Sequence, residues 1–99
     1  MTSEEQQNFY NEAYKKFLDH WDFYAQSMIC IEDMSELTKA LCKYSRYGKE
    51  NSPQEVKNNL LEEIADVLNV AEAMKNYFGA EQVEKIRKQK IERTLKRLE

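Results

Sequence analysis

The chain has 99 residues, 41% of them hydrophobic and 33% charged, with a net charge of −3, two glycines and one proline. This length allows one domain, residues 1–99, and excludes a large buried core. Six tyrosines, four phenylalanines and one tryptophan exclude a disordered acidic chain. Because helix breakers are scarce, long helices and an all-α fold are expected.

Charge is unevenly distributed along the chain. Residues 1–82 carry a net charge of −7 and residues 83–99 a net charge of +4. An acidic body without a recognised binding motif argues against nucleic-acid binding. No signal peptide opens the sequence and no apolar run approaches the length of a membrane span, so no membrane contact is expected. The expected location is the cytoplasm, where Cys30 and Cys42 would stay reduced.

The first expected helix begins near Ser3, whose hydroxyl is placed to cap its first turn, and runs to about His20. Its inward-facing residues would be Phe9, Ala13, Phe17, Leu18 and Trp21. A short break is expected within residues 19–22, although neither glycine nor proline marks it. A second helix would span Tyr24 to Tyr47 and end at Gly48, a residue that suits a helix C-cap.

Ser52, Pro53 and Glu55 predict the start of a third helix, with the serine as N-cap and the proline in the first turn. This helix would run from Pro53 to about Phe78, and a fourth would follow from about Ala80 to the end. Inward positions of the fourth helix would be Val83, Ile86, Ile91, Thr94 and Leu98. Heptads are not sustained well enough for a simple coiled coil. The expected architecture is a four-helix-bundle-like domain, completed by a homo-oligomer (a dimer or tetramer) because the chain is small.

Two acidic clusters lie within otherwise apolar helical stripes. The first contains Glu32, Asp33 and Glu36, and the second contains Glu62, Glu63 and Asp66. At 100° per residue, Asp33 with Glu36, and Glu63 with Asp66, fall on the apolar face of their helix. Burying an unpaired carboxylate is costly, so a cation is expected beside these acids, and a divalent metal is the simplest candidate.

The short connection between the second and third helices favours antiparallel packing, which would let the four carboxylates converge. A set of hard oxygen ligands suits Mg²⁺, which is usually completed by water and substrate phosphates. A di-iron carboxylate bundle would need Glu-x-x-His pairs, and the only histidine, His20, is far from both clusters.

With their surroundings, the two clusters resemble the MazG-like all-α nucleoside triphosphate pyrophosphohydrolases. The shared features are the first acidic cluster continuing as Glu36-Leu37 and Ala40-Leu41, the block from Glu62 to Val67, Gln26 upstream, and Lys90-Ile91 with Arg93 near the end. The resemblance covers roughly Trp21 to Leu98. One departure is Asp33, where the family usually has Glu: the shorter side chain would reach a metal through water, or Glu32 would compensate.

The resemblance implies hydrolysis of a nucleoside or deoxynucleoside triphosphate to the monophosphate and pyrophosphate. It also implies that Mg²⁺, with Mn²⁺ as a substitute, is bound by Asp33, Glu36, Glu63 and Asp66. Glu32 and Glu62, each one residue from an implied ligand, would act as general base or orient a ligand, and spacing does not distinguish these roles.

Five other side chains are candidates for nucleotide contacts. Gln26 would touch the base or sugar, or be a buried, hydrogen-bonded amide. Asn69 would orient a ligand or remain in solvent, and Trp21 would stack on a base or pack in the core. Lys90 and Arg93 would bind phosphates or form salt bridges.

Two rival functions stay open beside the hydrolase. An oligomeric helical interaction module without catalytic activity would use the acids in salt bridges with the basic last helix. A catalytically silent relative would bind metal alone. A salt-bridging face should avoid the apolar stripe, whereas these acids lie within it, so an Mg²⁺-dependent hydrolase is the favoured interpretation.

Overall fold

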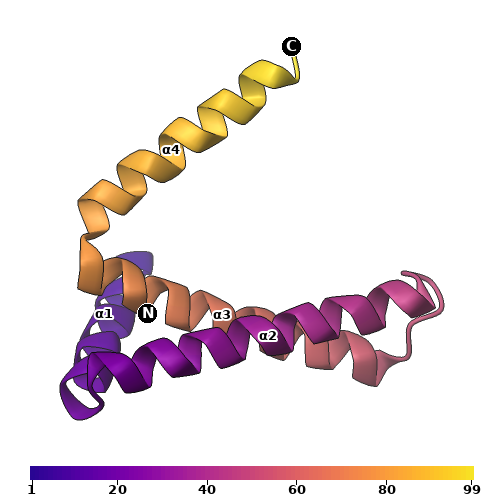
Figure 1. Cartoon of the computed structure of the whole chain (residues 1–99), viewed down its shortest axis with the longest axis horizontal. Helices are drawn as coiled ribbons and strands as arrows, with labels where there is room; N and C mark the ends of the chain where they lie inside the picture. Colours follow the sequence, from indigo (N-terminus) through magenta and orange to yellow (C-terminus); the bar gives the residue numbers. More distant parts are fainter.

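The computed structural model describes residues 1–99 and consists of four α-helices without a strand (Figure 1). In chain order the helices are α1 (Ser3–His20), α2 (Phe23–Tyr47), α3 (Gln54–Phe78) and α4 (Ala80–Arg97). The all-α prediction is confirmed. None of the four helices combines the length and apolarity that a membrane crossing requires.

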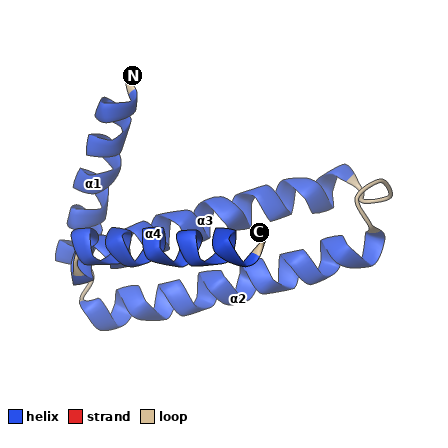
Figure 2. Cartoon of the chain, turned by 90° about the horizontal axis from the view of Figure 1, so that it is seen from above, coloured by secondary structure: helices blue, strands red, loops and turns tan.

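The body of the molecule is the antiparallel hairpin of α2 and α3, which lie side by side (Figure 2). Positions withdrawn from solvent recur at alternating spacings of four and three: Gln26, Cys30, Asp33, Leu37, Ala40 and Tyr44 on α2, and Val56, Leu60, Glu63, Val67, Val70 and Met74 on α3. These twelve positions form the seam of the hairpin, with the spacing of a coiled coil. Covered positions thus follow a heptad spacing on α2 and α3, although apolar residues do not fill all of them, as the sequence predicted. The repeat is inconspicuous in the sequence because Gln26, Asp33 and Glu63 occupy positions that a coiled coil normally gives to apolar residues.

The start of α1 and the break before α2 are both fixed by side-chain caps. Thr2, rather than the predicted Ser3, is the N-cap: its Oγ1 accepts a hydrogen bond from the Glu5 backbone N–H at 3.1 Å. The Glu5 carboxylate accepts in return from the Thr2 backbone N–H at 3.4 Å, which completes a capping box. The expected break falls at residues 21–22, and Asp22 starts α2 by accepting from the Ala25 N–H at 2.8 Å.

The loop between α2 and α3 differs from the prediction in the role of Ser52. Gly48 ends α2 as expected, with a φ of 78° in the left-handed region that favours glycine. Ser52 does not cap α3, because its hydroxyl donates to the Gly48 carbonyl at 2.7 Å. Instead α3 begins at Gln54, directly after Pro53, without a side-chain cap. Ser52 therefore stabilises the loop between α2 and α3 instead of capping α3.

The first helix crosses the end of the hairpin where α2 begins and α3 ends (Figure 2). Its one buried residue is Tyr14. Several large side chains that were expected to face inward stay exposed: Phe9 at 58%, Phe17 at 44% and Trp21 at 45%. Because α1 crosses the hairpin instead of running along it, only a short patch of α1 is covered.

The fourth helix leaves the end of α3 at Gly79 and projects away from the hairpin (Figure 1). Within the chain it contacts α3 alone, and Lys75 Nζ of α3 lies 3.1 Å from Glu84 Oε1 of α4. Of the positions expected to face inward, only Val83 is partly covered, while Ile86, Ile91, Thr94 and Leu98 are exposed. The prediction that this face meets a core is wrong for the single chain.

Candidate functional site

The two acidic clusters meet across the α2–α3 hairpin. Asp33 and Glu63 occupy seam positions and are half-buried, whereas Glu36 and Asp66 lie about one turn away on their helices and are exposed. Because the helices are antiparallel, Asp33 lies at the level of Asp66, and Glu63 at the level of Glu36. We call the whole set the acidic face: Glu32, Asp33, Glu36, Glu62, Glu63 and Asp66.

Members of the acidic face lie close enough to repel one another across the seam. Burial raises the pKa of the Asp33 carboxyl, and the charge of Asp66 on the opposite helix raises it further. Burial also raises the pKa of the Glu63 carboxyl, and the charges of Asp66 and Glu36 add to this effect. The adjacent Glu32 and Glu62 contribute in the same direction to their neighbours. The structure thus brings the two clusters together.

No basic side chain of the same chain neutralises the acidic face. The ion pairs of the chain join Lys75 to Glu72 and Glu84, and Arg87 to Glu84. Partly buried carboxylates that lack a counter-charge are energetically unfavourable. The acidic face therefore differs from a salt-bridged surface, because none of its six carboxylates takes part in an ion pair of the chain.

The donor chemistry of the acidic face suits a hard divalent cation. All six side chains offer carboxylate oxygens, which Mg²⁺ and Mn²⁺ prefer, and no histidine lies among them. No three side chains of the metal-binding types come close enough together to hold an ion in this structure. Mutual repulsion favours rotamers that keep the carboxylates apart. The residues therefore fit such an ion by the chemistry of their oxygen atoms, although the structure does not gather three of them around one point.

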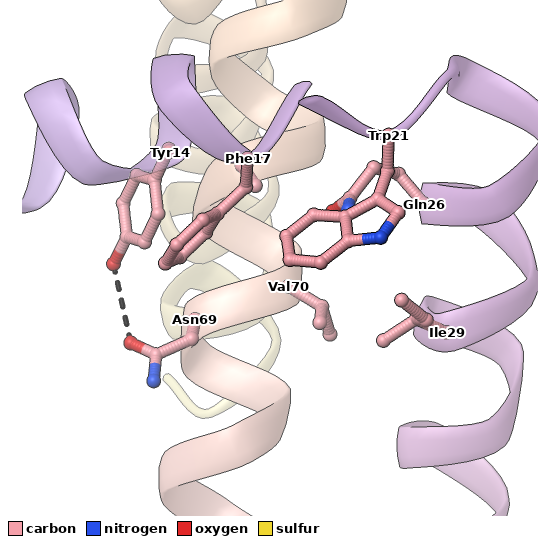
Figure 3. A pocket seen from close by; sticks show the side chains of 8 residues that line it. Tyr14, Phe17, Trp21, Gln26, Ile29, Asn69 and Val70 are labelled. Carbon is pink, nitrogen blue, oxygen red and sulfur yellow. Dashed lines mark hydrogen bonds between the residues drawn. The ribbon is translucent and has the colours of Figure 1, made fainter. Parts of the chain in front are cut away.

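A cavity of about 220 Å³ adjoins the acidic face where α1, α2 and α3 meet (Figure 3). It is lined by three aromatic side chains, two amides and three aliphatic side chains: Tyr14, Phe17, Trp21, Gln26, Asn69, Ile29, Val70 and Ala73. Ile29 lies one turn before Asp33, and Asn69 lies one turn after Asp66. The cavity and the acidic face therefore occupy successive turns of the same two helices.

The two amides give the cavity its polar groups. Gln26 is only 6% exposed, and no hydrogen bond joins its side-chain amide to the other residues of the cavity (Figure 3). Its polar atoms are not fully buried, because no buried side-chain nitrogen or oxygen of the structure lacks a hydrogen-bond partner. Of the two interpretations of Gln26, contact with a base or sugar stays a prediction, and the buried amide is confirmed in its burial but makes no internal hydrogen bond. Asn69 Oδ1 accepts a hydrogen bond from the Tyr14 hydroxyl at 3.2 Å (Figure 3), so Asn69 is oriented by the protein although it is exposed.

Tyr14 lines the cavity and was not predicted as a site residue. Tyr14 is 4% exposed, and burial, followed by the charge of Glu72, raises the pKa of its phenol. The hydroxyl therefore stays protonated and donates to Asn69. The available signal was the spacing of Tyr14, Phe17 and Trp21 at three and four residues, which puts them on one side of α1.

Trp21 lies at the rim of the cavity with its indole ring over the opening toward Gln26 (Figure 3). It remains 45% exposed. Its ring contacts Phe17, with ring centroids 6.1 Å apart, and His20 edge-on at 4.6 Å, and its stacking on a base stays a prediction.

Lys90 and Arg93 lie outside this site. Both are exposed on α4, where they line a shallow hollow with Ile86 and Gln89. Because α4 projects from the hairpin and contacts only α3, the structure does not bring these two residues to the acidic face of their own chain.

Comparisons of this chain with protein-family models, with curated proteins and with solved structures find no match. The resemblance to the MazG-like pyrophosphohydrolases therefore stands on the residues quoted for it, from Gln26 to Arg93.

Proposed function

We propose that the chain is an Mg²⁺-dependent pyrophosphohydrolase of a nucleoside or deoxynucleoside triphosphate, releasing the monophosphate and pyrophosphate. One observation carries the proposal: carboxylates without a counter-charge lie next to a cavity whose amides and aromatic rings suit a nucleobase. The MazG-like resemblance involves the same residues and supports it.

In this proposal Asp33, Glu36, Glu63 and Asp66 hold Mg²⁺, or Mn²⁺ in its place. A bound ion would neutralise the charge of the triphosphate and polarise its phosphorus–oxygen bonds. Burial is the main cause of the raised pKa values of Asp33 and Glu63, and repulsion from Asp66 and Glu36 adds to it; a bound cation would offset this repulsion.

Glu32 and Glu62 are the candidates for general base, because each adjoins two proposed ligands without occupying the seam. One of them accepts a proton from water as the water oxygen bonds to the α-phosphorus. The bond from the α-phosphorus to the oxygen that bridges to the β-phosphorus breaks, and its electron pair leaves with pyrophosphate. Separate Glu32→Gln and Glu62→Gln variants would assign the base, since only loss of the base should depress turnover without weakening metal affinity.

The cavity is proposed to hold the base of the nucleotide. At about 220 Å³ it is smaller than pockets for whole drug-sized ligands, which run to roughly 300–1,000 Å³, so it suits one part of a nucleotide. The Gln26 amide offers both donors and an acceptor to a base edge, and Asn69 adds donors beside it. Trp21 offers a ring for stacking. Phosphates attached to a base held here would extend along the hairpin toward the acidic face.

We also propose that the active form is a homo-oligomer in the reducing cytoplasm, where Cys30 and Cys42 remain thiols as they are in the structure. The oligomer would complete the helical bundle by covering the exposed face of α4. Neither nucleic acid nor a membrane has a part in the proposed reaction.

An oligomeric helical interaction module without catalysis is the alternative. The amount of exposed apolar side chain favours it, including Leu61 at 64%, Leu68 at 61% and Phe78 at 66%. Such a module should use its acids in ion pairs, and within the chain none of the six does so.

Pyrophosphate release from a panel of nucleotides, with and without Mg²⁺, tests the proposal. Glu63→Gln keeps size and helix propensity but removes one charge, so it should lower release by roughly a hundredfold or more. Glu55→Gln is the matched control, because Glu55 is an exposed acid on the same helix outside every ion pair, and its activity should be unchanged. Glu72 is unsuitable as a control, since its carboxylate lies 2.6 Å from Lys75 Nζ. If no nucleotide gives pyrophosphate, or if Glu63→Gln and Glu55→Gln lose pyrophosphate release equally, the hydrolase proposal is refuted and the interaction module is the remaining interpretation.

A further inference from the structure

Asn69 is held in one orientation although its side chain is exposed. The Tyr14 hydroxyl donates to Asn69 Oδ1 at 3.2 Å, and Tyr14 is itself only 4% exposed, so α1 fixes this oxygen from inside the protein. The nitrogen of the Asn69 amide points away from Tyr14, and no other side chain accepts a hydrogen bond from it (Figure 3). The amide therefore keeps two N–H donors free in a fixed direction.

Asn69 lies between the cavity and the acidic face. It lines the cavity, and it also continues the row of Glu63 and Asp66 along α3 at a spacing of three residues. A helical side chain leans toward the N-terminus of its own helix. On α3 this is the direction of Asp66 and Glu63, so the Asn69 amide leans toward the acids.

The other amide of the cavity leans the opposite way. Gln26 is on α2, which runs antiparallel to α3, so its side chain leans away from the acids. At a rise of 1.5 Å per residue, Gln26 lies about 10.5 Å along α2 from Asp33, whereas Asn69 lies about 4.5 Å along α3 from Asp66. A nucleotide with its base in the cavity and its phosphates at the acidic face would have its base near Gln26 and its first phosphate near Asn69.

The fixed polarity of the Asn69 amide selects the kind of group that it can bind. Because Tyr14 engages the oxygen, the amide offers donors toward a ligand. Donors bind most strongly to an oxygen that carries negative charge and has only lone pairs to offer, as a phosphate oxygen does. The α-phosphate follows the sugar directly, so it is the phosphate closest to Asn69.

We propose that Asn69 donates one N–H to a non-bridging oxygen of the α-phosphate, and that Tyr14 positions the Asn69 amide for this contact. The inference rests on the proposed function and adds a contact at the reacting phosphorus. Negative charge is redistributed over the α-phosphoryl oxygens as water attacks, and a donor fixed beforehand stabilises it without having to reorient. Tyr14 does not reach the phosphate and acts through Asn69.

Steady-state kinetics of the full chain separate a phosphate contact from a base contact. Losing a contact at the reacting phosphate lowers kcat, whereas losing a contact with the base raises KM and leaves kcat unchanged. Asn69→Ala should lower kcat by roughly a hundredfold, the usual effect of removing one such donor. Tyr14→Phe keeps the ring but lets the amide rotate, so kcat should fall by roughly tenfold. The double variant should be no slower than Asn69→Ala alone, because Tyr14 acts through Asn69.

Tyr10→Phe and Asn58→Ala are the matched controls, and both should keep kcat. Tyr10 is the neighbouring tyrosine of α1, and Asn58 is an exposed asparagine of α3 whose Oδ1 accepts from Gln54 Nε2 at 2.9 Å; neither lines the cavity. A rise in KM alone, or effects of Tyr14→Phe and Asn69→Ala that multiply in the double variant, would overturn the proposal and leave the hydrolase in place. An unmodified chain that hydrolyses no nucleotide would refute the proposed function, and the α-phosphate contact with it.

Nuclear magnetic resonance checks the contact without catalysis. The side-chain amide signals of Asn69, identified by their absence in Asn69→Ala, are followed while an α,β-methylene nucleoside triphosphate and Mg²⁺ are added. They should shift more than the side-chain signals of Asn58, and the shift should shrink in Tyr14→Phe. Binding that moves other signals but leaves those of Asn69 in place would refute the contact. No change in any signal would show that the nucleotide does not bind, and would refute the proposed function itself.

Discussion

Replacing Asp33 by leucine should stabilise the protein while abolishing the proposed hydrolysis. Asp33 occupies a seam position between Cys30 and Leu37, is half-buried, and has a pKa raised by burial and by Asp66. Full burial of a leucine side chain contributes ~1.5–3 kcal/mol, so a half-buried position should gain about 1 kcal/mol. Relief of repulsion adds to this gain. The free energy of unfolding should therefore rise by about 1 kcal/mol, and Tm by about 4–8 °C for a domain of this size.

The measurement is urea and thermal unfolding followed by circular dichroism, at one protein concentration in Mg²⁺-free buffer of low ionic strength. A fixed concentration is needed because the stability of an oligomer depends on it. Lys39→Leu is the control: Lys39 is an exposed residue of α2 outside every ion pair, and its replacement should change stability by less than about 0.5 kcal/mol. Asp33→Asn removes the charge without adding apolar area, so its gain should be smaller. A less stable Asp33→Leu protein would mean that the carboxylate has a structural partner, and would refute the reasoning.

Three further predictions concern pH, metal and the junction of α3 with α4. The raised pKa values of Asp33 and Glu63 mean that the folded state binds protons more readily than the unfolded state. The contribution of these two carboxyls to the free energy of unfolding is therefore greatest at low pH and is lost as pH rises through the raised pKa values. Tm in Mg²⁺-free buffer should rise as the pH is lowered from 7 toward 4.5, the ordinary pKa of a glutamate. This rise should be steeper than in the Glu63→Gln variant, and parallel curves of Tm against pH for the two proteins would contradict the prediction. Mg²⁺ at ten times its Kd should stabilise the protein by about 1.4 kcal/mol in a thermal-shift assay, and Asp33→Leu should remove most of that effect. Gly79→Ala should lower the free energy of unfolding, measured in urea, by about 1–3 kcal/mol. The reason is that the alanine would have a φ of 141° and its Cβ would lie 2.6 Å from Gln82 Oε1. An unchanged midpoint of urea unfolding would show that the backbone between α3 and α4 adjusts without cost.

The helices could be predicted from sequence because their ends are locally determined. Gly48 and Gly79 stop α2 and α3 at the expected residues, and Asp22 supplies the cap that restarts the chain after α1. The faces of α1 and α4 could not be predicted in the same way. Their patterns indicate which residues are apolar, but covering them depends on how a helix is placed against others, and α4 has no such neighbour within the chain.

The acidic face could be predicted from local sequence spacing, whereas the cavity could not. Acids spaced three residues apart on two helices of a short-looped hairpin must meet if the helices are antiparallel, so local spacing was enough to predict their approach. The cavity arises where α1 crosses the hairpin, and the hydrogen bond from Tyr14 to Asn69 joins residues 55 positions apart. Helical periodicity cannot predict a contact between residues so far apart in the sequence.

The polar residues of the seam bear most directly on the choice between a hydrolase and an interaction module. A coiled coil that uses buried polar groups to fix register pairs them with one another. Here Gln26 has no hydrogen-bonding partner, and Asp33 and Glu63 meet other acids across the seam. Asp33 and Glu63 therefore lower stability without specifying the pairing, and the Gln26 amide does not specify it either. All three lie on the stretch of the hairpin that runs from the cavity to the acidic face, where an exception to the apolar rule is expected if a ligand binds. Under the proposed function, a nucleotide with its divalent cation would satisfy all three: the base would bind the amide, and the metal would bind the two carboxylates.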